Sequence, residues 1–120
     1  MKLQVLWWVE LAIRPGRLDD FEKLTEEMVA ATRTERGVLS YQRFISDDRQ
    51  TVYAHERYES SNAAAAHLRK FVVAFGARYE SMVERKHFIV FGDPSEELKG
   101  LLDIYGATFH KPFGSIAYWG

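Results

Sequence analysis

The chain has 120 residues, of which 47% are hydrophobic and 28% are charged, and its formal net charge is −1. This length suits one domain with its own core, and the balanced charge excludes the basic surface that nucleic-acid binding requires. The absence of cysteine excludes disulfides and thiolate chemistry and favours a cytoplasmic location, and no apolar run approaches the roughly 20 residues of a membrane span, which excludes a membrane partner.

The first segment, residues 3–13, predicts a strand because it is rich in aromatic and β-branched residues. Trp7 and Trp8 are neighbours, so they point to opposite faces of that strand. A turn follows at residues 14–16, and residues 18–35 predict a helix with acidic residues in its first turn. The expected buried stripe of this helix is Leu18, Phe21, Leu24, Met28 and Ala31.

Residues 38–45 and 51–59 predict two further strands, joined by a polar hairpin loop at residues 47–50. In the second of these strands Glu56 shares a face with Tyr58, and His55 lies on the other face. Ser60 or Ser61 then offers the N-cap hydroxyl of a second long helix, which we expect to end at residue 84 or 85. Its expected buried stripe is Ala64, Leu68, Phe71, Phe75, Tyr79 and Met82, with His67 at the edge.

Residues 86–91 predict a fourth strand, and Ser95 caps a short helix at residues 96–103. The last segment, residues 107–119, is strongly apolar, so we expect it to dock on another surface. The large apolar side chains of this tail are Phe109, Phe113, Ile116, Tyr118 and Trp119. We interpret residues 1–120 as a single domain, with a core at about residues 3–92 and a C-terminal extension at about residues 93–120.

The predicted order β-α-β-β-α-β is that of a ferredoxin-like α+β fold, with an antiparallel sheet and both helices on one face. The strands nevertheless carry large apolar residues on both faces, as Trp7 and Trp8 do, or Tyr41 and Phe44. Because a sheet with one wet face alternates more cleanly, the second face needs cover. A second copy of the chain is the simplest source of that cover, so we expect a homodimer.

Three stretches of the sequence resemble the antibiotic biosynthesis monooxygenase (ABM) domain family. They are Gly37-Val38-Leu39-Ser40-Tyr41, Glu56-Arg57-Tyr58-Glu59-Ser60, and Ala63-Ala64 followed by His67-Leu68. The resemblance covers about residues 3–92 and implies a dimeric α+β barrel. Members of that family include cofactor-independent oxygenases of aromatic phenols and quinols, haem-degrading enzymes and an isomerase-like processor of sugar phosphates.

The sequence departs from two of these groups. The phenol oxygenases have an asparagine and a tryptophan in the third strand, where this chain has Ala54 and Tyr58. The haem-degrading members have an asparagine in the first strand, which this chain lacks, and a tryptophan in the second helix where His67 stands. Haem degradation is therefore disfavoured.

The resemblance implies that His67 is catalytic. A histidine titrates near neutral pH and can take a proton from a phenol or a quinol. The alternative is a structural histidine that is hydrogen-bonded to a carboxylate. Glu56, on an otherwise apolar face, must be paired or protonated. It either orients His67 or forms a structural salt bridge with an arginine of a helix.

An aromatic pocket is the expected substrate site, although the same side chains can instead form plain core. The candidate substrate-binding residues are Tyr41, Tyr58, Phe71, Phe75, Tyr79 and Trp8. No histidine or carboxylate motif has metal-ligand spacing, so we expect neither a metal nor a cofactor. The predicted function is a cofactor-independent monooxygenase acting on a small aromatic quinol or phenol. The alternative is a non-catalytic or isomerase-like dimeric barrel that binds a small ligand.

Overall fold

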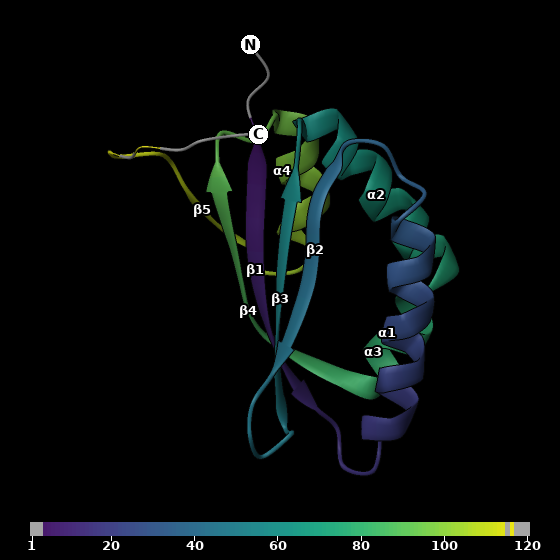
Figure 1. Cartoon of the computed structure of the whole chain (residues 1–120). Coiled ribbons are helices and arrows are strands. Elements are labelled where there is room, and N and C mark those ends of the chain that lie inside the picture. The colour runs from purple at the N-terminus through teal and green to yellow at the C-terminus, as the bar shows by residue number, and fades with distance from the viewer. Residues whose placement is uncertain (1–3, 115, 117–120) are drawn as a thin grey trace.

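One sheet carries helices on a single face in the computed structural model, which describes residues 4–114 and 116 (Figure 1). The elements are β1 (Val5–Ile13), α1 (Leu18–Thr32), β2 (Val38–Ile45), β3 (Thr51–Tyr58), α2 (Ser61–Ala74), α3 (Gly76–Met82), β4 (Val83–Gly92), α4 (Glu96–Asp103) and β5 (Thr108–His110). The predicted α+β, ferredoxin-like fold is confirmed. Within the described residues no helix is long and apolar enough to cross a membrane.

The strand order in the sheet is β2-β3-β1-β4-β5. The pairs β1–β3, β1–β4 and β2–β3 are antiparallel, as predicted, but β5 runs parallel to β4. The four predicted strands are thus antiparallel, and the sheet is mixed because the C-terminal extension adds a parallel strand that was not predicted. The segment that contains α4 carries the chain back along the sheet, so that β5 pairs with the second half of β4 and runs in the same direction.

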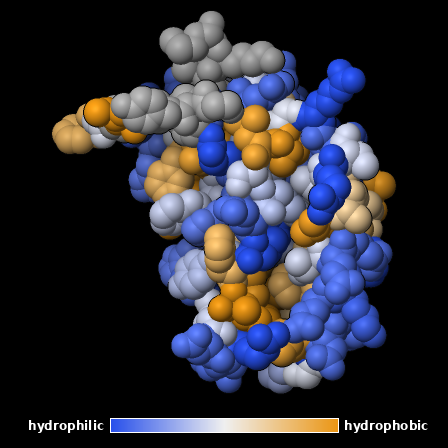
Figure 2. Space-filling view, viewed as in Figure 1, coloured by the Kyte–Doolittle hydropathy of each residue, from blue (hydrophilic) through white to orange (hydrophobic). Residues whose placement is uncertain are grey.

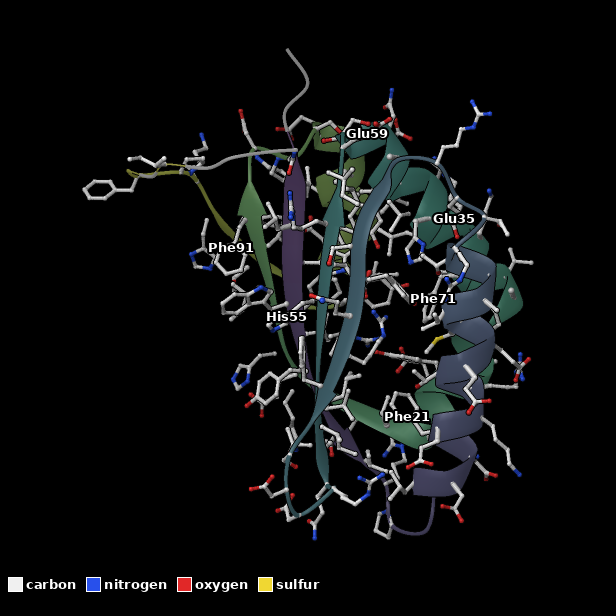
Figure 3. All side chains as sticks on the ribbon, viewed as in Figure 1. Phe21, Glu35, His55, Glu59, Phe71 and Phe91 are labelled. Atoms are coloured by element: carbon white, nitrogen blue, oxygen red, sulfur yellow. The ribbon has the colours of Figure 1, made fainter. Side chains whose placement is uncertain are left out.

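The two faces of the sheet differ in cover. Alternate residues of β1, including Trp7 at 1% exposure, pack beneath the helices, and Trp8 on the opposite face is 47% exposed. The Trp8 ring stacks on His55 with ring centroids 4.7 Å apart. Figure 3 shows His55 and Phe91 pointing away from the helices. The predicted apolar character of both faces is thus confirmed, and the outer face lies open in the single chain.

The second long helix is divided in two. α2 ends at Ala74, Phe75 leaves helical geometry with φ −130° and ψ −18°, and α3 begins at Gly76. The prediction of one helix to residue 84 or 85 was wrong because the chain bends at the glycine and enters β4 already at Val83. Ser60 is the N-cap, and its hydroxyl accepts a hydrogen bond from the Ala63 N–H.

The first helix also ends earlier than predicted, at Thr32 instead of residue 35. Phe21, Leu24 and Met28 are buried as expected, but Ala31 is exposed and Thr32 takes its place in the core. The three residues after Thr32 belong to the loop before β2. This loop brings Glu35 over α2, as Figure 3 shows at the upper end of α1.

The C-terminal extension docks in part. Ser95 caps α4 as predicted, Leu98 and Leu102 are fully buried, and Phe109 of β5 packs against the core. Phe113 and Ile116 stay 106% and 83% exposed, so the predicted docking fails for them in the single chain. Tyr118 and Trp119 lie outside the described residues.

Candidate functional site

His67 is a buried histidine on the inner face of α2. Its side chain is only 5% exposed, and its Nδ1 lies 3.1 Å from Oε1 of Glu35. A carboxylate only accepts hydrogen bonds, so the Nδ1–H donates to Glu35, and Nε2 faces the other way. The structure therefore orients the imidazole through the loop after α1, where the sequence pattern had suggested Glu56 for that role.

Close packing of this loop on α2 depends on small residues. Gly37 has a φ of 67°, and a Cβ added there would lie 2.6 Å from Cβ of Ala63. Such a separation is far inside van der Waals contact, so this position admits only glycine. The Glu59 N–H donates to the Gly37 carbonyl at 2.9 Å and ties the loop to the end of β3. Glycine and alanine thus allow Glu35 to reach His67.

Glu56 is the second carboxylate beside His67 and the centre of a buried network. Its Oε2 accepts from Nη2 of Arg43 at 2.8 Å, and its Oε1 accepts from Nε1 of Trp7 at 3.0 Å. The Tyr58 hydroxyl donates to the same Oε1. Oε1 also lies 3.8 Å from Nε2 of His67, which is an electrostatic contact and too long for a hydrogen bond.

Charge determines the state of this network. Burial alone would raise the pKa of Glu56, but the Arg43 guanidinium, His67 and the Tyr58 hydroxyl together hold that pKa below its usual value. Burial likewise disfavours the charged form of Arg43, but the Glu56 carboxylate, together with Tyr41, Tyr79 and Tyr58, outweighs this effect and raises the pKa of Arg43. Glu56 is therefore an ionised carboxylate paired with a strand arginine, not with an arginine of a helix.

Two cavities meet at His67. The inner cavity, about 30 Å³, lies between the sheet and α2, and the outer pocket, about 180 Å³, opens between the loop after α1 and α2. Both are lined by Tyr41, His67 and Phe71, so these three side chains form the wall between them. Figure 3 shows Phe71 pointing into the space between the helices and the sheet. The inner cavity has room for about one water molecule.

The predicted pocket residues are only partly brought together. Tyr41 and Phe71 line both cavities, Tyr79 lines the inner one and Phe75 the outer one. Tyr58 lies behind them with its hydroxyl on Glu56. Trp8 is on the opposite face of the sheet and shares no cavity with His67, and its neighbour Trp7 lines the inner cavity instead. Strand alternation separates the two tryptophans without saying which of them faces inward.

Sequence reasoning missed Glu35, Arg43 and Arg85. Arg43 shares the inner face of β2 with Tyr41, two positions away, and this parity was a usable signal. Its guanidinium stacks over the Tyr41 ring at 3.5 Å. Arg85 follows an irregularity in the register between β1 and β4, and Glu35 stands in a loop, so neither had a periodic signal.

Tyr41 is held neutral at this junction. Burial raises the pKa of its hydroxyl to about 12, against the opposing effect of the Arg43 charge. Burial also raises the pKa of Tyr79 and Tyr58. These phenols therefore act as neutral hydrogen-bonding groups at neutral pH. In the described part of the chain no three histidine or carboxylate side chains are grouped as metal ligands.

Figure 2 shows a further hydrophobic patch low in the centre of the view, between β2 and α1. It corresponds to a groove of about 330 Å³ lined by Leu18, Phe21, Phe44 and Ile45, among others. Apart from Arg43, whose bonded side is turned to Glu56, this groove contains none of the network described above. Among the described residues the buried polar side chains are Thr32, Glu56 and His67, and the last two belong to this network.

Comparisons with known proteins agree on the fold. MupZ from Pseudomonas fluorescens matches with a TM-score of 0.84 at 16% identity, over 96% of this chain and 94% of that chain. Rv0793 from Mycobacterium tuberculosis matches with a TM-score of 0.67 at 24% identity, over 78% of this chain and 97% of that chain. A Bacteroides thetaiotaomicron protein described as a possible oxidoreductase matches with a TM-score of 0.66 at 20% identity, over 78% of this chain and 100% of that chain. The search of curated proteins finds no match.

These structural likenesses concern the fold, because identities this low do not carry function. A stronger result comes from the sequence itself. The sequence model of the antibiotic biosynthesis monooxygenase family matches residues 7–85, which span β1 to the first part of β4 and include His67, Glu35 and Glu56. The chain belongs to the antibiotic biosynthesis monooxygenase (ABM) family.

Proposed function

We propose that the protein is a cofactor-independent monooxygenase that acts on a small aromatic phenol or quinol, with His67 as general base. The observation that carries the proposal is the buried His67 imidazole, whose Nδ1 is held by Glu35 while Nε2 stays free of a hydrogen bond beside the inner cavity. A fixed tautomer with an available Nε2 lone pair is what a general base needs.

The proposed reaction needs only dioxygen as oxidant. His67 takes the hydroxyl proton, and the resulting anion delocalises charge onto a ring carbon. That carbon passes one electron to O2, and the substrate radical and superoxide combine into a carbon-bound peroxide. Loss of the proton on that carbon and cleavage of the O–O bond leave a carbonyl on the ring and release the second oxygen atom as water. The substrate supplies all four electrons.

Glu35 and Glu56 have different roles in this proposal. Glu35 is a positioning residue, since its hydrogen bond fixes the ring of His67. Glu56 remains ionised and places negative charge 3.8 Å from Nε2, where the proton arrives. That charge favours the imidazolium formed in the transition state, and Arg43 limits its strength by direct pairing.

The outer pocket is the proposed position of the aromatic ring. With about 180 Å³ it is the larger of the two spaces at His67, and Tyr41, Phe71 and Phe75 line it with aromatic surface. The substrate hydroxyl would then point inward past His67. Phe71 is half-buried, so a rotation of its side chain is the simplest way to join the two cavities.

The protein is also proposed to be a homodimer whose sheets pack face to face. The support is the open outer face of the sheet, where Trp8, Phe44 and Tyr53 are 47%, 50% and 43% exposed. Exposed Phe113 and Ile116 extend this apolar surface along the tail. An obligate interface of this type buries on the order of 2,000 Å² or more. Light scattering that finds a stable monomer at micromolar concentration would contradict this proposal.

A second candidate is a non-catalytic or isomerase-like barrel that binds a small ligand. The observation that favours it is the size of the inner cavity, about 30 Å³, together with the complete pairing of Glu56. In that case His67 is a structural histidine between two carboxylates.

Oxygen uptake separates the two candidates. A panel of phenols and quinols is incubated with the protein, without added metal or flavin, and uptake is compared with that of His67→Ala. The matched control is His87→Ala, because His87 also pairs with a carboxylate, Glu10, at 3.1 Å but is 68% exposed. We expect uptake that His67→Ala abolishes and His87→Ala retains. Uptake at the parental rate in His67→Ala would refute the proposed mechanism.

A further inference from the structure

Two arginines that line the inner cavity each have a buried side-chain nitrogen without a hydrogen-bond partner. These nitrogens are Nη1 of Arg43 and Nε of Arg85, and both side chains line the same cavity of about 30 Å³. Buried donors in folded proteins are almost always paired, so two such donors at one cavity call for an explanation. An acceptor inside the cavity would satisfy both.

Neither arginine is free to turn away. Arg43 is held by Glu56 at 2.8 Å and lies over the Tyr41 ring. Arg85 is held by Glu80 at 2.7 Å, and its guanidinium lies 4.6 Å from the centroid of the Tyr105 ring. Each guanidinium thus has one nitrogen paired with a carboxylate and an aromatic ring beside it. The unpaired N–H groups are a preorganised feature and not the result of a loose side chain.

The charges around the cavity leave it receptive to an anion. Glu56 compensates Arg43 directly, whereas Glu80 is 50% exposed and shares its charge with solvent while Arg85 is 15% exposed. Positive charge near the cavity is therefore less completely neutralised on the side of Arg85. His67 adds a further cation once it has accepted a proton.

We propose that the inner cavity is an oxyanion subsite, in which Nη1–H of Arg43 and Nε–H of Arg85 donate to one anionic oxygen. The inference deepens the proposed function and rests on it for the source of that oxygen, which is the substrate hydroxyl after His67 has taken its proton. The volume admits one oxygen and excludes an aromatic ring. The substrate class is thereby a phenol or quinol that reacts as its oxyanion, with the ring in the outer pocket.

The test uses 4-nitrophenol, whose anion absorbs visible light and which reports binding without turnover. Absorbance titrations over pH, with and without protein, give the apparent pKa of the bound probe. We expect wild-type protein to bind the anion at least tenfold more tightly than the neutral phenol. Arg85→Gln should remove this preference and leave binding of the neutral form unchanged. Arg43→Lys, which keeps a positive charge opposite Glu56, should reduce the preference for the anion.

The matched control is Arg78→Gln. Arg78 also pairs with a glutamate, Glu27, at 3.0 Å and lies near an aromatic ring, but it is 48% exposed and lines neither cavity. It should behave as wild type. A second arm adds sodium fluoride, a single-atom anion, to the 4-nitrophenol titration. Displacement of the phenolate by fluoride in wild-type protein but not in Arg85→Gln supports the subsite and shows that a free anion also fits. Phenolate binding that fluoride does not weaken supports a ring-borne oxygen.

An unchanged anion preference in Arg85→Gln, or a wild-type protein that binds neither probe, overturns the subsite and leaves a water molecule as its occupant. Oxygen uptake that depends on His67 would then still stand. Conversely, anion binding that depends on Arg85 without any oxygen uptake keeps the subsite and rejects the monooxygenase.

Discussion

Glu56→Gln tests how much the buried network contributes to stability. The change keeps the shape of the side chain but removes the charge opposite Arg43, whose side chain is only 10% exposed. The new amide nitrogen cannot accept the hydrogen bonds that Arg43, Trp7 or Tyr58 now donate. Removing one partner of a buried ion pair costs about 3–5 kcal/mol, so we expect a loss of that size in the free energy of unfolding at pH 7.

The pH dependence gives this prediction its sign. Folding lowers the pKa of Glu56. The stabilisation that its carboxylate gives to the fold is therefore present above the unfolded pKa of about 4.3 and is lost as the pH falls through the folded pKa. The difference in the free energy of unfolding between wild type and Glu56→Gln should therefore be largest at pH 7 and become smaller below pH about 4.

Urea denaturation at fixed protein concentration measures this difference. The matched control is Glu97→Gln, whose ion pair with Arg69 is more than half exposed on both sides and should contribute less than about 1 kcal/mol. A loss below about 1 kcal/mol for Glu56→Gln at pH 7, or a loss that does not change with pH, would refute the account of the network.

Three further predictions follow from the same structure. Glu35→Gln should lower turnover less than His67→Ala, which should lower it about 10²- to 10⁴-fold. Oxygen uptake with an identified substrate compares the two variants. Leu24→Ala should destabilise the fold by roughly 2–5 kcal/mol, since Leu24 is 1% exposed, and an unchanged thermal melt would contradict its place in the core. Burial raises the pKa of Tyr41 to about 12. The neutral Tyr41 side chain should therefore contribute roughly 2–3 kcal/mol to the free energy of unfolding below pH 10, and this contribution should be lost as the pH rises towards 12. Urea denaturation across that range should show a shallower alkaline loss in Tyr41→Phe, and equal slopes would show that Tyr41 ionises as freely in the folded chain as in the unfolded one.

The architecture was predictable because periodicity acts on many residues at once. Alternation in residues 51–59 and helical spacing from Leu68 to Met82 each average over several positions. The structure confirms the buried face of β3, and in the helices it buries Leu68, Tyr79 and Met82 but leaves Phe71 and Phe75 half-buried. Gly76 stands inside the predicted second helix, but propensity alone does not say whether a glycine bends a helix or ends it. The parallel placement of β5 depends on how α4 packs, which no local pattern encodes.

The site was predictable where it lies on regular elements. His67 and Glu56 occupy a helix face and a strand face, so their mutual approach followed from the fold. Glu35 reaches His67 from a loop, through a contact between residues 32 positions apart, and loop geometry carries no period. Arg43 was missed although strand alternation places it on the same face as Tyr41. An arginine on an inward face normally suggests that the inward and outward faces of the strand have been assigned the wrong way round.

The short strand β5 has a consequence for the behaviour of the chain at high concentration. Ile89, Val90 and Phe91 of β4 pair with Thr108, Phe109 and His110, so the backbone groups along this stretch are already occupied. A chain shortened before residue 108 would keep every group described around His67 but leave this part of β4 as an unpaired edge, bordered by large apolar side chains. Such an edge is a template for strand addition between molecules. We therefore expect a truncated variant to fail by self-association and precipitation, while the residues around His67 keep their arrangement.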